Sequence, residues 1–241
     1  MKKLILAFVC AICATAGIAE DYFGDKEHSW FILQLGIDDP VQFPSSSYNI
    51  YGVRLDLIAA TSYDMYGIDF GLFGISEHDM IGIPVTLASI TKGDMYGLQL
   101  GALCNVVGGN MYGVQFAGIF NYGKGLGAGV QFAPVNVMSV YTGVELGILA
   151  NVTKNEFWGL QLAAVNINVA DAHGWSIGLV NSTSRLFGIQ IGAINIATES
   201  GKGLQIGVFN GANDFNGMQI GLLNALSNSA IEILPIFNAN F

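Results

Sequence analysis

Cysteine is scarce in this chain: Cys10 and Cys13 lie near the N-terminus, and Cys104 is the third and last. Because we expect the N-terminal segment to be cleaved off, Cys104 is left alone, which excludes an intramolecular disulfide and a zinc site built on cysteines. Basic residues are also few, 9 against 18 acidic ones. The chain therefore lacks the basic surface that binds nucleic acid or anionic headgroups, and we expect no nucleic acid and no charge-driven docking on anionic lipid.

Long apolar runs are absent as well. After residue 19 no stretch reads as a membrane-spanning helix, and the most apolar window, 130–152, contains Pro134, Asn136 and Glu145. Yet 52% of all residues are hydrophobic and only 11% are charged. An apolar composition without a helical span indicates strands that alternate between apolar and polar residues, as in membrane barrels.

The first residues have the order of a secretory signal peptide. Lys2 and Lys3 precede a short apolar run at 4–12, small residues follow to Ala19, and acidic residues come directly after. We therefore predict a signal peptide over 1–19, a single repeat-built β domain over 20–241, and export to the bacterial outer membrane. No domain boundary interrupts the second segment.

The rest of the chain is one repeated unit. Gly-x-Gln-x-Gly, or the same with a final Ala, recurs and is followed three or four residues later by Asn, as in 97–101 with Asn105 and 203–207 with Asn210. After a first gap of 20 residues the copies follow every 13 to 16 residues. Fourteen copies start at Ile32, Gly52, Gly67, Gly82, Gly97, Gly113, Gly129, Gly143, Gly159, Gly174, Gly188, Gly203, Gly217 and Ala230.

Each unit alternates with a period of two. Its second and fourth positions are apolar in every copy, and its third is polar in every copy but one, where Pro84 stands. A period of two is typical of a strand with one apolar and one polar face. In a barrel the polar face would line the lumen, and its predicted lining residues are Arg54, Asp56, Asp69, Gln99, Gln115, Gln131, Glu145, Gln161, Gln190, Gln205 and Gln219.

Two all-β architectures fit fourteen such strands. In a β-solenoid of about fourteen coils, all copies run in the same direction and we expect the apolar face to fill a central core. The uniform copies and the recurring Asn favour this alternative. In an antiparallel transmembrane β-barrel of about fourteen strands, the apolar face contacts lipid. Strands of roughly ten residues, and aromatic residues such as Tyr66 and Trp158 just before the unit, favour the barrel, and this is the fold that we predict.

The last strand adds a resemblance. Its alternating apolar residues Phe237 and Ala239, followed by a terminal Phe241, resemble the carboxy-terminal signature of bacterial outer-membrane barrels, although Pro235 departs from it. The resemblance implies recognition of Phe241 by the barrel-assembly machinery and a lipid bilayer as partner. The Gly-x-Gln-x-Gly-Asn units of 32–241 also resemble glycine-rich bacterial surface-repeat proteins, a family that implies surface location and no established activity.

No pattern indicates catalysis or a resident metal. His28 and His78 lie among acidic residues, which is typical of solvated turns, and no cofactor or catalytic residue is expected. We predict a pore for small solutes whose carboxylates Asp56, Asp69 and Glu145 outweigh Arg54, although the same residues can equally be paired inside the barrel. The alternative is a surface structural or adhesion repeat protein without transport. The sequence names no solute.

Overall fold

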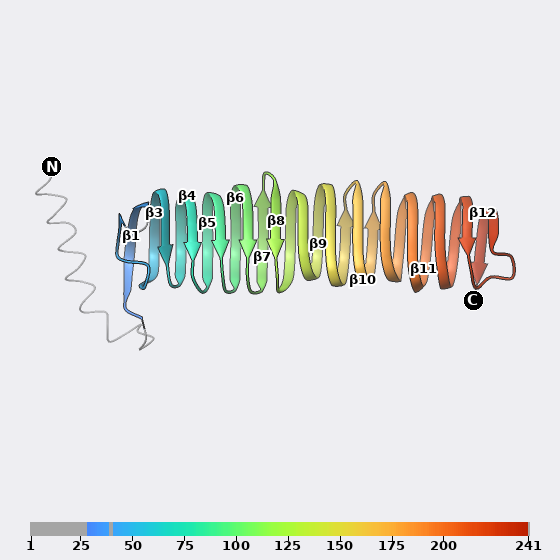
Figure 1. The fold of residues 1–241 in the computed structure, drawn as a ribbon, viewed down its shortest axis with the longest axis horizontal. Coiled ribbons are helices and arrows are strands. Elements are labelled where there is room, and N and C mark those ends of the chain that lie inside the picture. The colour runs from blue at the N-terminus through green and yellow to red at the C-terminus, as the bar shows by residue number, and fades with distance from the viewer. Residues whose placement is uncertain (1–27, 39–40, 241) are drawn as a thin grey trace, which may run out of the picture.

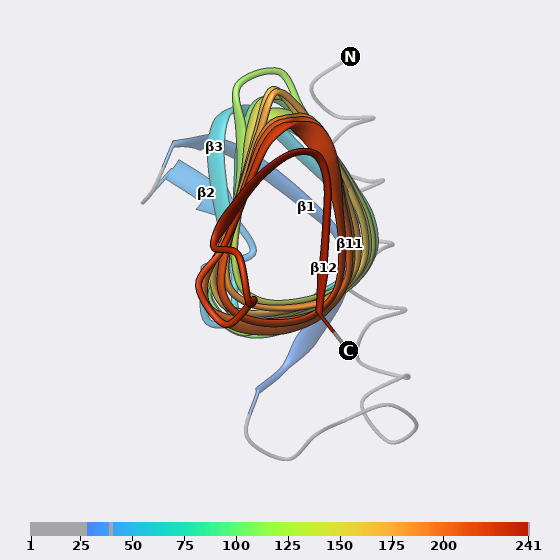
Figure 2. The same ribbon diagram turned by 90° about the vertical axis from the view of Figure 1, so that its right-hand side faces the viewer.

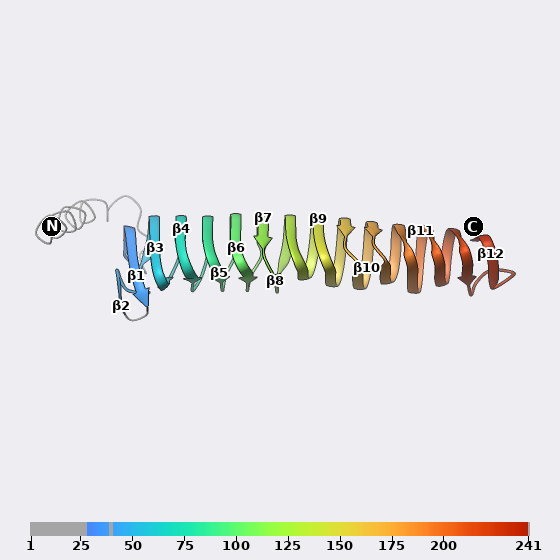
Figure 3. The same ribbon diagram turned by 90° about the horizontal axis from the view of Figure 1, so that it is seen from above.

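The protein is a straight rod built from stacked turns of chain, as Figure 1 shows for a computed structural model. The structure describes residues 28–38 and 41–240. Successive turns lie side by side along the rod, with the first described residues at one end and the last at the other (Figures 1 and 3). Within the described residues, no helix is long and apolar enough to span a membrane. The predicted signal peptide lies outside them.

The strands follow the rod in chain order. They are β1 (Trp30–Asp38), β2 (Val41–Phe43), β3 (Asn49–Ser62), β4 (Met65–Ser76), β5 (Met80–Thr91), β6 (Met95–Val107), β7 (Met111–Ala117), β8 (Phe120–Gly123), β9 (Leu126–Leu162), β10 (Val165–Ile177), β11 (Val180–Leu226) and β12 (Ile233–Asn240). β9 and β11 each run through several turns. Nearly all pairings are parallel, for example β4 with β5 and β9 with β10.

The repeat sets the register between turns. Gly67 pairs with Gly52 and with Gly82, and this alignment continues to Gly217. Twelve glycines from Gly52 to Gly217, the ladder glycines, have φ between 129° and 157°. Since stacked strands lie about 4.8 Å apart, eleven steps make the rod roughly 50 Å long.

Each turn is a flattened coil (Figure 2) with two flanks, which in one turn are the separate strands β7 and β8 that both pair with β6. The first flank begins with the ladder glycine and continues for about four residues. A corner follows, the apolar edge, and then a second flank that carries the recurring Asn. The turn closes through the residues just before the next ladder glycine, which form the polar edge.

The barrel prediction is wrong. The strands are parallel because the chain coils back to the same direction in every turn, so the protein is a β-solenoid of about 11 turns, not an antiparallel transmembrane barrel or a porin-like fold. The segment after each Gly-x-Gln-x-Gly unit, which the barrel prediction placed in the same membrane-crossing strand, is a second flank, such as residues 104–107 of β6. Each repeat therefore contributes two short strand segments instead of one membrane-crossing strand.

The predicted facing within a solenoid is wrong too. The polar residues fill the interior, where Gln99 and Asn105 have no exposed surface, and the apolar residues point outward. The interior beneath the polar edge also contains buried apolar side chains, among them Ile50, Met65, Met80, Met95, Met111, Tyr141 and Phe157 in one cluster and Leu186, Phe215 and Leu226 in another.

Antiparallel strands cover both ends of the rod. β2 folds back along β1 at the N-terminal end, and β12 pairs antiparallel with the end of β11. An open sheet edge is a template for pairing with other chains, so these two strands limit end-to-end association. The predicted recognition residue Phe241 lies outside the described residues.

Candidate functional site

All of the predicted lining residues lie in the interior. None is more than 6% exposed, and most have no exposed surface. Their side chains bond to one another from turn to turn and fill the space that a barrel would leave to water. The filled interior favours the alternative, a surface structural or adhesion repeat protein without transport.

The glutamines form a ladder along the first flank. Gln115 Nε2 donates to Gln99 Oε1 at 2.6 Å, and Gln131 Nε2 donates to Gln115 Oε1 at 2.7 Å. A second run joins Gln219 to Gln205 and Gln205 to Gln190, each at 2.8 Å. In every pair the amide donates toward the N-terminal end of the rod.

The asparagines form a longer ladder along the second flank. Nine residues take part, and the Nδ2 of each of the first eight donates to the Oδ1 of the next at 2.8–3.1 Å: Asn105, Asn121, Asn136, Asn151, Asn166, Asn181, Asn195, Asn210 and Asn224. Each Nδ2 also donates to a backbone carbonyl of the following turn beside the apolar edge, such as Ile177 O from Asn166 at 3.0 Å. Sequence reasoning noted these asparagines but did not place them in the interior; their fixed position after each unit is the signal that marks them.

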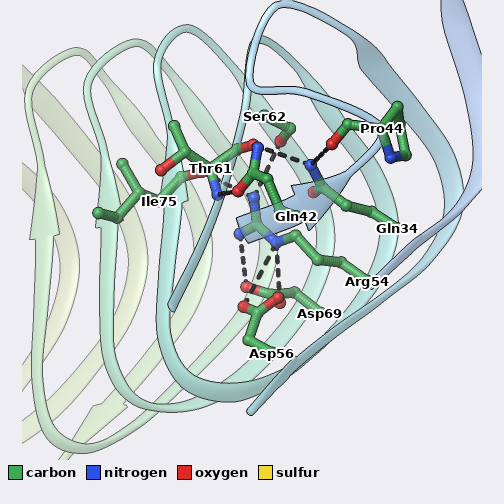
Figure 4. A network of polar contacts seen from close by, with 9 residues as sticks. All are labelled: Gln34, Gln42, Pro44, Arg54, Asp56, Thr61, Ser62, Asp69 and Ile75. Atoms are coloured by element: carbon green, nitrogen blue, oxygen red, sulfur yellow. Dashed lines mark hydrogen bonds and ion pairs between the residues drawn. The ribbon is translucent and has the colours of Figure 1, made fainter. Parts of the chain in front are cut away.

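An ionic cluster takes the place of the Gln ladder in the first turns (Figure 4). Arg54 is 1% exposed; its Nε and Nη2 donate to the two oxygens of Asp69 at 2.9 and 2.6 Å, and its Nη1 donates to Ser62 Oγ. Asp56 Oδ2 lies 3.6 Å from Arg54 Nε. Burial, together with the neighbouring Asp69, raises the pKa of Asp56 to about 8, although Arg54 opposes the shift. A protonated Asp56 leaves the single cation balanced by Asp69.

Gln34 and Gln42 close the N-terminal mouth of the interior. Both donate from Nε2 to the carbonyl oxygen of Thr61, at 2.9 and 2.7 Å, and Gln42 Oε1 accepts from the Thr61 amide. Figure 4 shows these side chains beside the Arg54 cluster. The N-terminal end of the polar interior is therefore capped by hydrogen bonds.

Glu145 interrupts the Gln ladder. Gln161 Nε2 donates to Glu145 Oε2 at 2.6 Å, but Glu145 Oε1 and Gln131 Oε1 are both buried without a hydrogen-bond partner. Burial raises the pKa of Glu145 to about 7, although hydrogen bonds from Gln161 and Thr153 oppose the shift. A proton on Oε1 would supply the donor that the ladder lacks at this turn.

Replacing Glu145 by Gln should make the rod less sensitive to pH. A carboxyl with a higher pKa in the folded chain than in the unfolded chain stabilises the fold most below its ordinary value, 4.5, and this stabilisation is lost as the pH rises toward about 7. The slope is at most about 1.4 kcal/mol per pH unit. Urea midpoints measured in detergent from pH 4 to 8 should fall less in Glu145→Gln than in the parent chain. Equal slopes would mean that Glu145 is ionised in the fold.

The exterior of the flanks and of one corner is apolar along the whole rod. On the first flank, the positions one and three residues after each ladder glycine are apolar in every turn, for example Ile68 at 47% and Phe70 at 58% exposure. A shallow groove between Leu100, Phe116 and Phe132 has a volume of about 410 Å³. The apolar edge is the most exposed part, with Leu57, Ile58, Leu72, Phe73, Leu103, Ile119, Ile148, Leu149, Leu179, Ile194, Val208, Leu222 and Leu223.

Charge is confined to the opposite edge. Between residues 52 and 226, every charged side chain outside the interior lies within five positions before a ladder glycine. These are eight acidic and five basic residues: Asp64, Glu77, Asp79, Lys92, Asp94, Lys124, Lys154, Glu156, Asp171, Arg185, Glu199, Lys202 and Asp214. A contiguous apolar surface of this length marks an interaction surface rather than ordinary solvent-exposed protein.

The polar edge also contains a cluster of possible metal ligands. Asp64, His78 and Asp79 offer ligand atoms within 4.8 Å of one another. Asp64 Oδ1 already accepts from the Asp79 amide at 2.8 Å and lies 2.9 Å from His78 Nδ1, and this hydrogen bond is the main cause of a raised His78 pKa. Asp79 and Asp94 accept in the same way from the next turn. The cluster is thus explained as a series of turn caps.

In the part of the chain that the structure describes, the polar interior is filled and the charge lies along one edge. The apolar exterior is therefore the candidate functional surface. Comparisons with protein-family models, with curated proteins and with solved structures found no match for this chain.

Proposed function

We propose that the protein is a structural element of the bacterial cell surface that acts through its apolar exterior, without transport and without catalysis. One observation carries this proposal: the apolar surface is continuous along a rod roughly 50 Å long, at about 4.8 Å per turn, while its polar groups are bonded inside. The filled interior leaves no room for a diffusing solute. The apolar exterior is a large surface for contact with water-poor surroundings. The signal peptide expected at 1–19 supports export.

Charged residues on the apolar edge should release the protein from the cell envelope. Ile148 and Leu149 are 59% and 58% exposed at this edge, so Ile148→Glu/Leu149→Glu should leave the rod folded. We expect the full chain, expressed in a Gram-negative host, to fractionate with envelope membranes and to need detergent for release. The double variant should move at least partly to the soluble fraction.

A matched control uses the polar edge. Ser139 and Asn155 lie there and bond to each other at 2.8 Å, so Ser139→Glu/Asn155→Glu adds the same charge where charge already occurs. This variant should fractionate like the parent. A parent chain that is soluble and monomeric without detergent would overturn the proposed function, and equal release of both variants would show that charge alone, not the apolar edge, decides retention.

A further inference from the structure

The proposed function does not say what covers the apolar exterior. Resting on that function, we propose that the hydrocarbon of one membrane leaflet covers it. The rod lies with its long axis in the plane of the membrane. Its apolar edge points toward the bilayer centre, and its polar edge stays among the headgroups and water. The protein is then embedded in one leaflet and does not cross the membrane.

The first observation is the order of side chains from the polar edge downward. Of the twelve positions directly before the ladder glycines, seven have aromatic rings: Tyr51, Tyr66, Tyr96, Tyr112, Trp158, His173 and Phe187. The other five are Ile81, Ala128, Thr142, Lys202 and Asn216, and the uniformly apolar positions begin after this column. The polar ends of these rings turn toward the polar edge: Tyr96 OH donates to Asp94 at 3.3 Å and Trp158 Nε1 to Glu156 at 2.7 Å. Aromatic residues with one wet and one apolar end gather at membrane interfaces.

The second observation is the height of the apolar part. From the position after a ladder glycine to the tip of the apolar edge the chain advances five residues, which is roughly 16 Å at about 3.3 Å per residue. One leaflet contributes about 15 Å to a hydrocarbon core of about 30 Å. The apolar part therefore matches one leaflet. A rod standing upright would instead place about 30 Å of its charged edge in hydrocarbon.

The third observation is how the backbone is satisfied at the apolar edge. In lipid, water cannot bond to the amides and carbonyls of a corner, so the protein must supply their partners. At this corner the amide of Ile119 donates to Leu103 O at 2.8 Å, and that of Ile194 donates to Leu179 O at 2.9 Å. The Asn ladder donates to the neighbouring carbonyls from inside. A corner exposed to water would not need these internal donors.

Two native tryptophans test the orientation, because they lie on neighbouring turns at different depths. Trp158 pairs with His173, so Trp175 lies two residues further toward the apolar edge; the two side chains are 47% and 53% exposed. Trp158 is the single remaining tryptophan in Trp30→Phe/Trp175→Phe. Trp175 is the single remaining tryptophan in Trp30→Phe/Trp158→Phe. The full-length variants are reconstituted into phosphatidylcholine vesicles with bromine near the headgroups or near the chain ends.

We expect Trp158 to be quenched more by the shallow bromine and Trp175 more by the deep one. The depth difference should be about 7 Å, two residues at about 3.3 Å each. A single Trp at the apolar edge, Leu179→Trp in a chain with its native tryptophans replaced by Phe, should be quenched most by the deepest bromine. Circular dichroism matching the parent shows that the variants fold.

The outcomes separate this inference from the proposed function. No quenching by either bromine, in a protein that still sediments with the cell envelope and cross-links to itself, would mean that a second copy covers the apolar surface; the inference would fail and the proposed function would stand. Equal quenching depths for Trp158 and Trp175 would refute the orientation. A soluble chain that binds neither vesicles nor envelope would overturn both.

Discussion

Asn166→Asp should lower the free energy of unfolding by about 2–6 kcal/mol, because two buried acceptors lose their donor and each such loss costs about 1–3 kcal/mol. Asn166 Nδ2 donates to Ile177 O at 3.0 Å and to Asn181 Oδ1 at 2.8 Å, in an interior where Asn166 has no exposed surface. Aspartate has the same shape but, when ionised, no hydrogen to donate. The urea midpoint of the purified protein in detergent, followed by circular dichroism, measures the change.

The pH dependence of this variant tests the mechanism. A protonated aspartate regains one donor, so the deficit relative to the parent should shrink as the pH falls through the carboxyl's raised pKa. Asn155→Asp is the matched control: its Nδ2 donates to Ser139 Oγ at the exposed polar edge, and surface changes of this kind stay within about 0.5 kcal/mol. If Asn166→Asp and Asn155→Asp gave equal midpoints, the Asn ladder would contribute nothing to stability.

The register between the repeats could be predicted from the periodicity of the sequence, but the direction in which the chain runs from one repeat to the next could not. The starts of the units at Gly52 to Gly217 coincide with the ladder glycines, and the parity that separates Gln99 from Leu100 is the one that separates interior from exterior. A period of two and a spacing of about fifteen residues are the same whether the chain reverses or coils. The strand direction therefore could not be obtained from periodicity.

The facing was misjudged for a physical reason. Apolar residues normally fill a core, so we expected a solenoid to hide them, and only the barrel prediction left them outside. In this protein the amides of Asn and Gln satisfy one another along the rod, which removes the usual cost of burying polar groups. The recurring Asn already indicated the coiled path, because Asn at one fixed position in successive units can bond in a ladder only if all units run in the same direction.

The site residues were partly predictable. Arg54 and Asp69 were expected as a possible pair on the polar face, and they form a bidentate ion pair inside the rod. Sequence reasoning could not place Asp64 beside His78, because the contact joins two different turns. It also interpreted the aromatic residues before the units as a feature of a barrel, whereas coiling in one direction places them in a single column.

Gly159→Ala, at a ladder glycine in the middle of the rod, should be strongly destabilising. Gly159 has φ of +135°, a conformation that costs other residues about 1–3 kcal/mol, and an added Cβ would collide with the carbonyl oxygen of Gly143 in the preceding turn. That oxygen belongs to a stacked backbone and cannot move away alone. We expect a urea midpoint below that of any single change at the polar edge.

Two comparison variants show whether the ladder is responsible. Gly211→Ala adds the same methyl group where φ is not in the left-handed range and the nearest atom is a Phe209 ring carbon at 3.2 Å, so it should change the midpoint little. Gly217→Ala makes the same change as Gly159→Ala at the last ladder glycine, where the added Cβ would meet Gly203 O. Because each turn of a solenoid contacts only its neighbours, a defect at the end should fray one turn, whereas one in the middle should divide the rod into two shorter stacks. Amide hydrogen exchange in Gly159→Ala should therefore show lost protection on both sides of residue 159. In Gly217→Ala the loss should be confined to residues beyond 203. An equal, local loss of protection in both variants would contradict a cooperative ladder.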